Sequence, residues 1–97
     1  GIGFVEGDAI RYIRTIGALI PEGLSIPLDG RGITVRAVKT GSSQLVPDVR
    51  LDPDYLAITE GGPGAPRILS ELVVPVIIDG KAEAVINLES TRLEAFT

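Results

Sequence analysis

Apolar and polar residues alternate most clearly between Ser70 and Ser90, where two apolar runs flank Asp79-Gly80. An Asp-Gly pair between two such runs is a strong signal for a β-hairpin. The register of a hairpin decides which side chains share a face, because a slip of one residue moves every side chain to the opposite face. The segment therefore predicts a hairpin whose register has to be argued from its side chains.

A two-residue turn at Asp79-Gly80 is one of two plausible registers. It places Glu71 opposite Leu88. Glu71 would then lie among the apolar side chains of both strands. That register buries an acid without a partner, which is costly.

A three-residue loop over 78–80, with its glycine in the left-handed conformation, is the other register. It places Ile77 opposite Lys81 and Glu71 opposite Asn87. We expect this register, because burying an unpaired carboxylate costs more than any turn preference. One face then holds only apolar side chains, those of Leu72, Val74, Val76, Ala82, Ala84, Ile86 and Leu88. The opposite face holds Glu71, Val73, Pro75, Ile77, Glu83, Val85, Asn87 and Glu89.

The first half of the chain predicts two strands and a helix. Residues 2–5 and 9–16 have strand patterns and are joined by a turn over 6–8. Prolines and glycines between residues 21 and 30 indicate a long irregular connection. Apolar residues then recur at helical spacing over 32–40, before a glycine suited to end a helix.

The remaining segments are shorter. Residues 45–49 predict a brief strand, and Asp52-Pro53 predicts the start of a short helix that continues toward Ile58. Residues 61–66 are rich in Gly and Pro and predict a loop, while 93–96 are typical of a first helical turn. Strands, small helices and a terminal hairpin together indicate an α+β fold with an antiparallel sheet.

The amino-acid composition restricts the kinds of functional site that the chain can form. The 97 residues are enough for one domain and include no Cys and no His, which leaves no thiol nucleophile and removes the commonest metal ligand. A net charge of −4, with the basic residues spread along the chain, argues against direct binding of nucleic acid. No apolar run is long enough to span a membrane, and no signal peptide is evident. We expect a soluble cytoplasmic domain without cofactor, metal or catalytic residue.

Several short motifs follow one another along the chain, namely Gly30-Arg31-Gly32-Ile33, Val46-Pro47-Asp48-Val49, Asp52-Pro53-Asp54-Tyr55, Ser70-Glu71-Leu72-Val73-Val74-Pro75, Asp79-Gly80-Lys81 and Asn87-Leu88-Glu89-Ser90 before Ala95-Phe96. In this order they resemble the motifs of the GAF domain, a PAS-like sensory module. The resemblance implies a central antiparallel sheet of five to six strands, with a ligand pocket between one face and the short helices and loops.

The same resemblance implies helices before the first strand and after the last, both packed on the opposite face. We expect residues 1–97 to form a single GAF-like domain in which these terminal helices are truncated. The apolar row from Leu72 to Leu88 would then lack its cover, and an exposed face of that kind exceeds what soluble monomers tolerate. We expect a second copy of the chain or an output domain to cover it. The alternative is that the first strands curl over it.

The hairpin is most similar to that of free methionine sulfoxide reductases, GAF proteins whose acids hold the ammonium group of the substrate. The matching positions are Glu71, Asn87 and Glu89, and Asn87 stands where those proteins have an acid. The resemblance also implies a cysteine nucleophile, which this sequence lacks. We therefore expect non-covalent ligand binding and not enzyme activity.

The candidate ligand-binding residues are Glu71, Glu89, Asn87, Asp48, Tyr55 and Ser70, with Val73, Pro75 and Val85 as an apolar floor. Each polar candidate also has a structural interpretation. Asp48 can cap the following turn, Ser70 and Glu71 can satisfy backbone donors or pair with an arginine, and Tyr55 can be a core residue. Arg11 and Arg14 project to opposite faces of one strand, so at most one reaches the pocket. Paired carboxylates also suit glycoside hydrolysis or a hard metal ion, but no other residue supports either.

Two functions follow from these expectations. The first is a regulatory, small-molecule-sensing domain of a larger signalling or transcription-control protein. The alternative is a dimerisation or scaffold module with a vestigial pocket. An open cavity lined by Glu71 and Glu89 would favour the first function, whereas Ile77 and Tyr55 packed into a closed pocket would favour the second.

Overall fold

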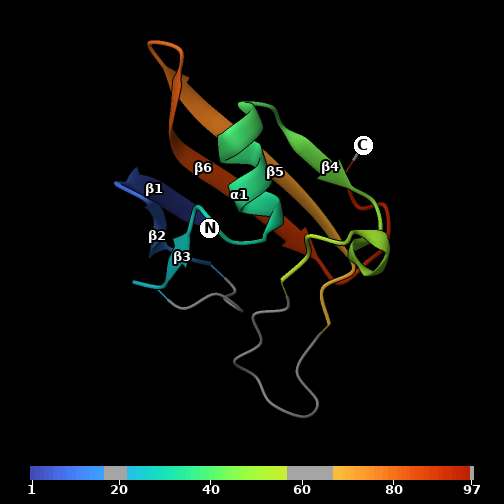
Figure 1. The fold of residues 1–97 in the computed structure, drawn as a ribbon. Helices are drawn as coiled ribbons and strands as arrows, with labels where there is room; N and C mark the ends of the chain where they lie inside the picture. The colour runs from blue at the N-terminus through green and yellow to red at the C-terminus, as the bar shows by residue number, and fades with distance from the viewer. Residues whose placement is uncertain (17–21, 57–66, 97) are drawn as a thin grey trace.

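A six-stranded antiparallel sheet forms the body of the protein, in a computed structural model that describes residues 1–16, 22–56 and 67–96 (Figure 1). The strand order is β3-β2-β1-β6-β5-β4. The strands are β1 (Ile2–Glu6), β2 (Ala9–Arg14), β3 (Ser25–Pro27), β4 (Gln44–Val46), β5 (Ser70–Ile78) and β6 (Lys81–Ser90). One helix, α1 (Ile33–Thr40), and a 3-10 helix, η1 (Val49–Leu51), complete the regular structure. This is the predicted α+β fold.

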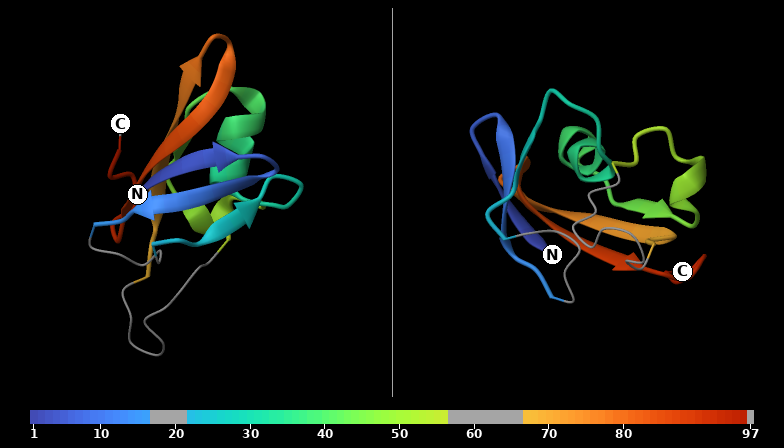
Figure 2. Two further views of the ribbon diagram at one scale, coloured as in Figure 1. Left: turned by 90° about the vertical axis from the view of Figure 1, so that its left-hand side faces the viewer. Right: turned by 90° about the horizontal axis from the view of Figure 1, so that it is seen from below.

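Helix α1 covers one face of the sheet (Figure 2). It begins where the amide of Arg36 donates to the carbonyl of Gly32 at 3.0 Å, and it ends at Gly41, whose φ of 68° is the predicted left-handed stop. Ile33 and Ala37 are buried against the sheet, where Val73 is fully buried. Burial of these side chains holds α1 to the sheet and makes this face the core side.

The hairpin turn is the two-residue turn, so the predicted three-residue loop is wrong. Ile78 pairs with Lys81, and both Asp79 and Gly80 have positive φ angles, of 53° and 78°. Positive φ at both central residues is typical of the type I′ turn, whose twist matches that of the strands. The conformational preference of Asp79-Gly80 therefore determines the conformation of the hairpin tip.

A bulge next to the turn restores the predicted separation of faces. The register shifts between Val76, which pairs with Ala84, and Ile77, which pairs with Ala82, so Glu83 has no partner on β5. One extra residue in a strand moves every later side chain to the other face. The bulge thus removes the conflict that the two-residue turn would otherwise create.

Glu71 consequently pairs with Glu89, and Val73 pairs with Asn87. The predicted pair of Glu71 with Asn87 is wrong by two positions. A shift of two residues keeps the same faces, so the two predicted sets of side chains are confirmed along the body of the hairpin, over 71–76 and 84–89. Next to the turn the prediction is wrong for Ala82, because it pairs with Ile77 and shares its face.

Three other local predictions need correction. The connection before α1 is not wholly irregular, because Ser25–Pro27 forms β3 against β2. The predicted strand over 45–49 ends at Val46, and η1 occupies the positions before Asp52. Residues 93–96 form a turn, with Glu94 at a φ of 52°, and not the first turn of a helix. Ile58 and residues 61–66 lie outside the described residues.

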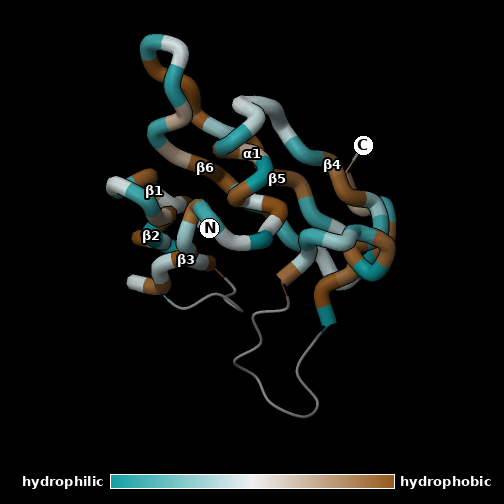
Figure 3. The backbone as a smooth tube through the Cα atoms, viewed as in Figure 1, coloured by the Kyte–Doolittle hydropathy of each residue, from teal (hydrophilic) through white to brown (hydrophobic). Residues whose placement is uncertain are grey.

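The face of the sheet opposite α1 is apolar and partly exposed. Strand β1 pairs edge to edge with β6 and does not curl over this face. Figure 3 shows the apolar positions that recur along β5 and β6. On β1, β2, β5 and β6, the large apolar side chains that belong to this face and remain at least a third exposed are Ile2, Phe4, Ile13, Val74, Ile86 and Leu88. We refer to these six residues as the apolar sheet face.

Candidate functional site

A small cavity lies between the sheet and the first turn of α1. It measures about 30 Å³ and is lined by Tyr12, Ile26, Gly32, Ile33, Thr34, Tyr55, Leu56, Glu71, Asn87 and Glu89. Strands β2, β5 and β6 form its floor, and α1 and the segment after η1 form its walls. A space of this size holds about two water molecules or one small polar group.

Glu71 and Glu89 form the acidic side of the cavity. They are direct cross-strand partners on β5 and β6, and Glu71 is only 5% exposed. The pKa of Glu71 is raised to about 8. Burial is the main cause, and the neighbouring charge of Glu89 contributes to the rise. Burial also raises the pKa of Glu89. Near neutral pH the pair therefore holds about one proton that two isolated glutamates would have released.

Asn87 adds a neutral acceptor beside this pair. It is 2% exposed, and its Nδ2 donates to Oε1 of Glu89 at 3.1 Å. Its Oδ1 is buried without a hydrogen-bond partner among the described residues. Buried polar atoms are nearly always paired, so an unpaired oxygen that belongs to a cavity-lining residue is a reason to expect a donor from outside the chain.

Three hydroxyl groups complete the polar lining, those of Tyr12, Thr34 and Tyr55. Tyr12 is 1% exposed, and burial raises its pKa while a hydrogen bond with Thr34 partly opposes the rise. Burial also raises the pKa of Tyr55, as do the charges of Glu89 and Glu71. Both phenols stay protonated at neutral pH.

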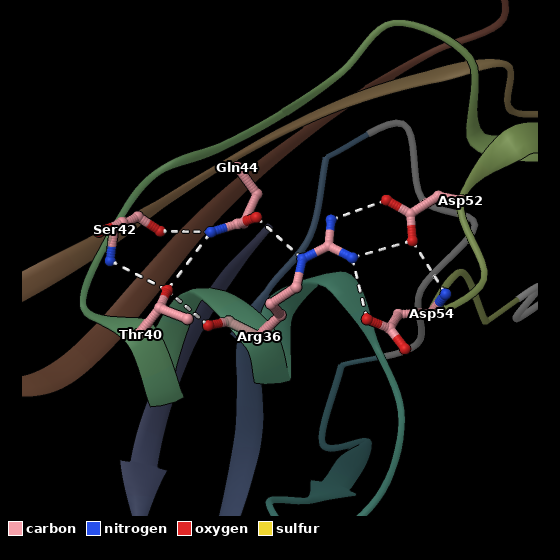
Figure 4. A network of polar contacts seen from close by, with 6 residues as sticks. All are labelled: Arg36, Thr40, Ser42, Gln44, Asp52 and Asp54. Carbon is pink, nitrogen blue, oxygen red and sulfur yellow. Dashed lines mark hydrogen bonds and ion pairs between the residues drawn. The ribbon is translucent and has the colours of Figure 1, made fainter.

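Arg36 ties the wall that carries Tyr55 to α1 (Figure 4). Its guanidinium donates two parallel hydrogen bonds to Asp52, at 3.0 and 2.7 Å, and a third to Asp54 at 2.9 Å. Its Nε donates to Gln44 at 2.8 Å. Arg36 is one turn along α1 from the cavity-lining Ile33, so this Arg36–Asp52–Asp54 cluster links the two walls. The hydrogen bond from Arg36 also lowers the pKa of Asp52.

Four of the six predicted ligand-binding residues line the cavity, namely Glu71, Glu89, Asn87 and Tyr55. Asp48 does not. Its carboxylate caps η1 by accepting from the Arg50 amide at 3.0 Å, and it also accepts from the Arg50 guanidinium at 2.9 and 2.8 Å. The structural interpretation of Asp48 as a cap is therefore correct, and its ligand role is withdrawn.

Ser70 also lies away from the cavity. Its hydroxyl donates to the carbonyl of Arg92 and accepts from the amide of Ala95 at 3.4 Å. Ser70 alternates with Glu71 along β5, so it belongs to the opposite face of the sheet. Its role is to hold the segment after β6 against the start of β5.

The predicted apolar floor of the pocket is also wrong. Val73 and Val85 are fully buried in the core, and neither they nor Pro75 line the cavity. Neither Arg11 nor Arg14 reaches it, and Arg11 forms an exposed ion pair with Glu6 at 3.6 Å.

Tyr12 and Thr34 are the cavity-lining residues with polar side chains that sequence reasoning missed. The strand pattern over 9–14 places Tyr12 on the same face as Ile10, which is fully buried, and this alternation was the available signal. No comparable signal marks Thr34, because its approach to the cavity depends on where α1 crosses the sheet.

Within residues 1–16, 22–56 and 67–96, no group of three or more His, Cys, Asp or Glu side chains is placed to hold a metal ion. No helix in that part of the chain is long and apolar enough to cross a bilayer.

No protein-family model and no curated protein matches the sequence. Solved structures do match. A free methionine-R-sulfoxide reductase from Neisseria meningitidis, in complex with its substrate, is 29% identical with a TM-score of 0.84, and the match covers 100% of this chain and 54% of that chain. A structure described as that of the GAF domain is 26% identical with a TM-score of 0.82, and the match covers 100% and 52%.

The chain has a GAF-like fold. A protein from Burkholderia vietnamiensis assigned as a GAF sensor is also similar to this GAF-like domain, with 29% identity, a TM-score of 0.74, and coverage of 100% and 56%. The structures similar to this domain thus include both an enzyme and GAF domains of the sensory kind. The domain spans little more than half the length of each, 54%, 52% and 56%.

Proposed function

We propose that this GAF-like domain is the regulatory, ligand-sensing part of a larger signalling or transcription-control protein, and that it binds a small ammonium-bearing molecule non-covalently. The observation that carries the proposal is the buried Glu71–Glu89 pair beside the unpaired Oδ1 of Asn87. Carboxylate and amide oxygens accept hydrogen bonds, and a protonated amine supplies both the donors and the positive charge.

The size of the cavity is consistent with binding of the ammonium group alone. About 30 Å³ accommodates a head group and not a whole metabolite. The ammonium group would enter between Glu71 and Glu89, and the rest of the molecule would extend toward the rim beside Tyr55 and Leu56. Binding there would press on the wall that Arg36 ties to α1, which is a physical route from the cavity to the surface of the domain.

Reductase activity is the principal competing function, because similarity to the Neisseria enzyme counts toward it. The resemblance implies a cysteine nucleophile for that chemistry, and none of the 97 residues is a cysteine. We therefore propose that this domain recognises its ligand and does not reduce it.

A scaffold role is a second candidate, and the exposed apolar sheet face favours it. The filled pocket that it requires is not supported by Ile77, which is 44% exposed and does not line the cavity. Tyr55 lines the cavity without filling it. A scaffold role and ligand sensing are compatible on opposite faces of one sheet.

A thermal-shift screen of amines, amino acids, polyamines and nucleotides tests the proposal. A ligand at 100 times its Kd stabilises a fold by about 2.7 kcal/mol, which corresponds to a rise in Tm of about 10 °C or more for a domain of this size. We expect hits among the amines, and we expect Glu71→Gln and Glu89→Gln to remove the rise.

Glu6→Gln is the matched control, because it makes the same chemical change at an exposed position outside the cavity. It should leave the rise intact. The proposal fails if no amine stabilises the wild-type domain, or if stabilisation by an amine persists in both cavity variants.

A further inference from the structure

A second depression lies where the β5–β6 hairpin leaves the rest of the sheet. Strand β1 pairs with β6 only from Ile2 to Phe4, the latter opposite Ala84. Beyond that point the bulge at Glu83 bends β6, and the tip of the hairpin projects past β1 and β2 (Figure 2, left). The space between β1 and the tip is an open groove of about 580 Å³.

The walls of this groove carry exposed apolar side chains. Phe4 on β1 is 45% exposed and Ile78 at the tip is 54% exposed, and both line the groove. Phe4 is also part of the apolar sheet face, so the groove continues the exposed apolar surface to its edge. Aromatic and aliphatic side chains in a concave site are typical anchors for a binding partner.

The groove is also acidic. Glu6, Asp79 and Glu83 line it together with Lys81, so three carboxylates face one ammonium and leave two negative charges. Within the described parts of the chain, these four residues form one ion pair, between Glu6 and Arg11 at 3.6 Å, with both side chains 53% exposed. Such an exposed pair is worth little, so Glu6 is open to a competing cation.

The backbone in the groove is suited to an extended partner. Residues 5–6 of β1 pair only with β2, and residues 81–82 of β6 pair only with β5, so these two segments do not pair with one another. Edges of this kind accept an added strand through main-chain hydrogen bonds. Phe4 and Glu6 are two residues apart on β1 and share one face, so the side chains on one face of an added strand can meet both an apolar and an acidic side chain.

We propose that this groove is a docking site for an extended, basic peptide segment of a partner protein, one in which each face carries both aliphatic residues and lysine or arginine. The aliphatic side chains pack against Phe4 and Ile78, and the cations lie opposite Glu6 and Glu83. The site is separate from the ligand cavity and does not depend on the function proposed for it.

Titration of the 97-residue domain with an eight-residue peptide that repeats Lys-Lys-Val-Val, the Lys-Val peptide, tests this proposal. A peptide that repeats Glu-Glu-Val-Val, the Glu-Val peptide, is the charge-reversed control. Amide chemical shifts from NMR locate the binding. We expect the Lys-Val peptide to perturb residues 4–6 and 78–83, and to bind more weakly as salt is added. Glu83→Lys and Ile78→Ser should each weaken binding by about tenfold, whereas Glu71→Gln should have no effect.

The proposal is overturned if the Lys-Val peptide does not bind, if the Glu-Val peptide binds as tightly, or if the perturbed amides lie elsewhere in the sheet. Two groove variants are used because they act through different physics, one through charge and one through apolar contact. Retained binding in both would also overturn it.

Discussion

At Glu71 the fold buries a carboxyl group that water would otherwise solvate. The sequence was sufficient to predict that Glu71, Asn87 and Glu89 share a face, because the other register would bury Glu71 among apolar side chains without a partner. It was not sufficient to place Asp48, whose partner Arg50 lies only two residues away and competes locally for the carboxylate. Residues with a partner close in sequence are better interpreted as caps than as ligands.

The buried Glu71 predicts an unusual dependence of stability on pH. Its pKa is raised from 4.5 to about 8 in the folded state, so the folded protein binds more protons than the unfolded chain between these values. The stability of the fold should therefore be greatest below about pH 4.5 as far as this group is concerned, and should fall until about pH 8. The slope is at most about 1.4 kcal/mol per pH unit.

Urea unfolding of the wild type and of Glu71→Gln at intervals from pH 5 to pH 8.5 measures this effect. Glu71→Gln has no carboxyl to titrate at that position, so its free energy of unfolding should change much less over this range. Equal slopes for the two proteins would show that Glu71 titrates normally.

At the scale of elements, the hairpin and the Arg36–Asp52–Asp54 cluster determine the shape of the cavity. The Asp79-Gly80 pair predicted the hairpin, but the bulge at Glu83 could not be predicted, because it reconciles the turn with side-chain burial in three dimensions. The cluster was equally hidden, since Arg36 and Asp52 are separated by 16 positions and meet only after α1 packs on the sheet. Long-range polar contacts of this kind leave no local pattern.

Replacement of Arg36 should loosen the wall that carries Tyr55. Arg36→Ala leaves the mostly buried carboxylate of Asp52 without its partner, at an expected cost of about 2–4 kcal/mol in unfolding free energy. Arg36→Lys keeps the charge but cannot donate two parallel hydrogen bonds, so its cost should be intermediate. Chemical denaturation measures both values.

Arg50→Ala is the matched control, because it breaks an Arg–Asp pair in which Arg50 is 55% exposed. Its effect on the unfolding free energy should be small, because solvent screens an exposed ion pair. An effect of Arg36→Ala no larger than that of Arg50→Ala would show that the cluster does not hold the wall.

At the scale of the whole molecule, the two faces of the sheet have different roles. One face carries α1 and the cavity, and the other is the apolar sheet face. The sequence predicted this asymmetry, since the alternation along the hairpin is strict on both sides of the bulge. It did not predict that β1 would extend the sheet beside β6, because strand order depends on contacts between distant segments.

Self-association through the apolar sheet face is the expected consequence. Analytical ultracentrifugation should find a dimer of the 97-residue domain at micromolar to millimolar concentration, and Ile86→Lys should convert it to a monomer. Ile77→Lys is the control, because Ile77 is similarly exposed but alternates with the residues of the apolar sheet face. A wild-type domain that stays monomeric, or equal effects of the two variants, would contradict this prediction.

The central claim is that the cavity receives a protonated amine between Glu71 and Glu89. Carbon-detected NMR of the glutamate carboxyl groups from pH 6 to pH 9, with methylammonium as the probe, tests it most directly, and tetramethylammonium, which has no N–H donor, is the control. The account predicts that Glu71 titrates near pH 8, that methylammonium lowers this pKa, and that methylammonium binds more tightly as pH rises toward 8. Titration of Glu71 near its ordinary pKa of 4.5, or equal responses to the two cations, would contradict it.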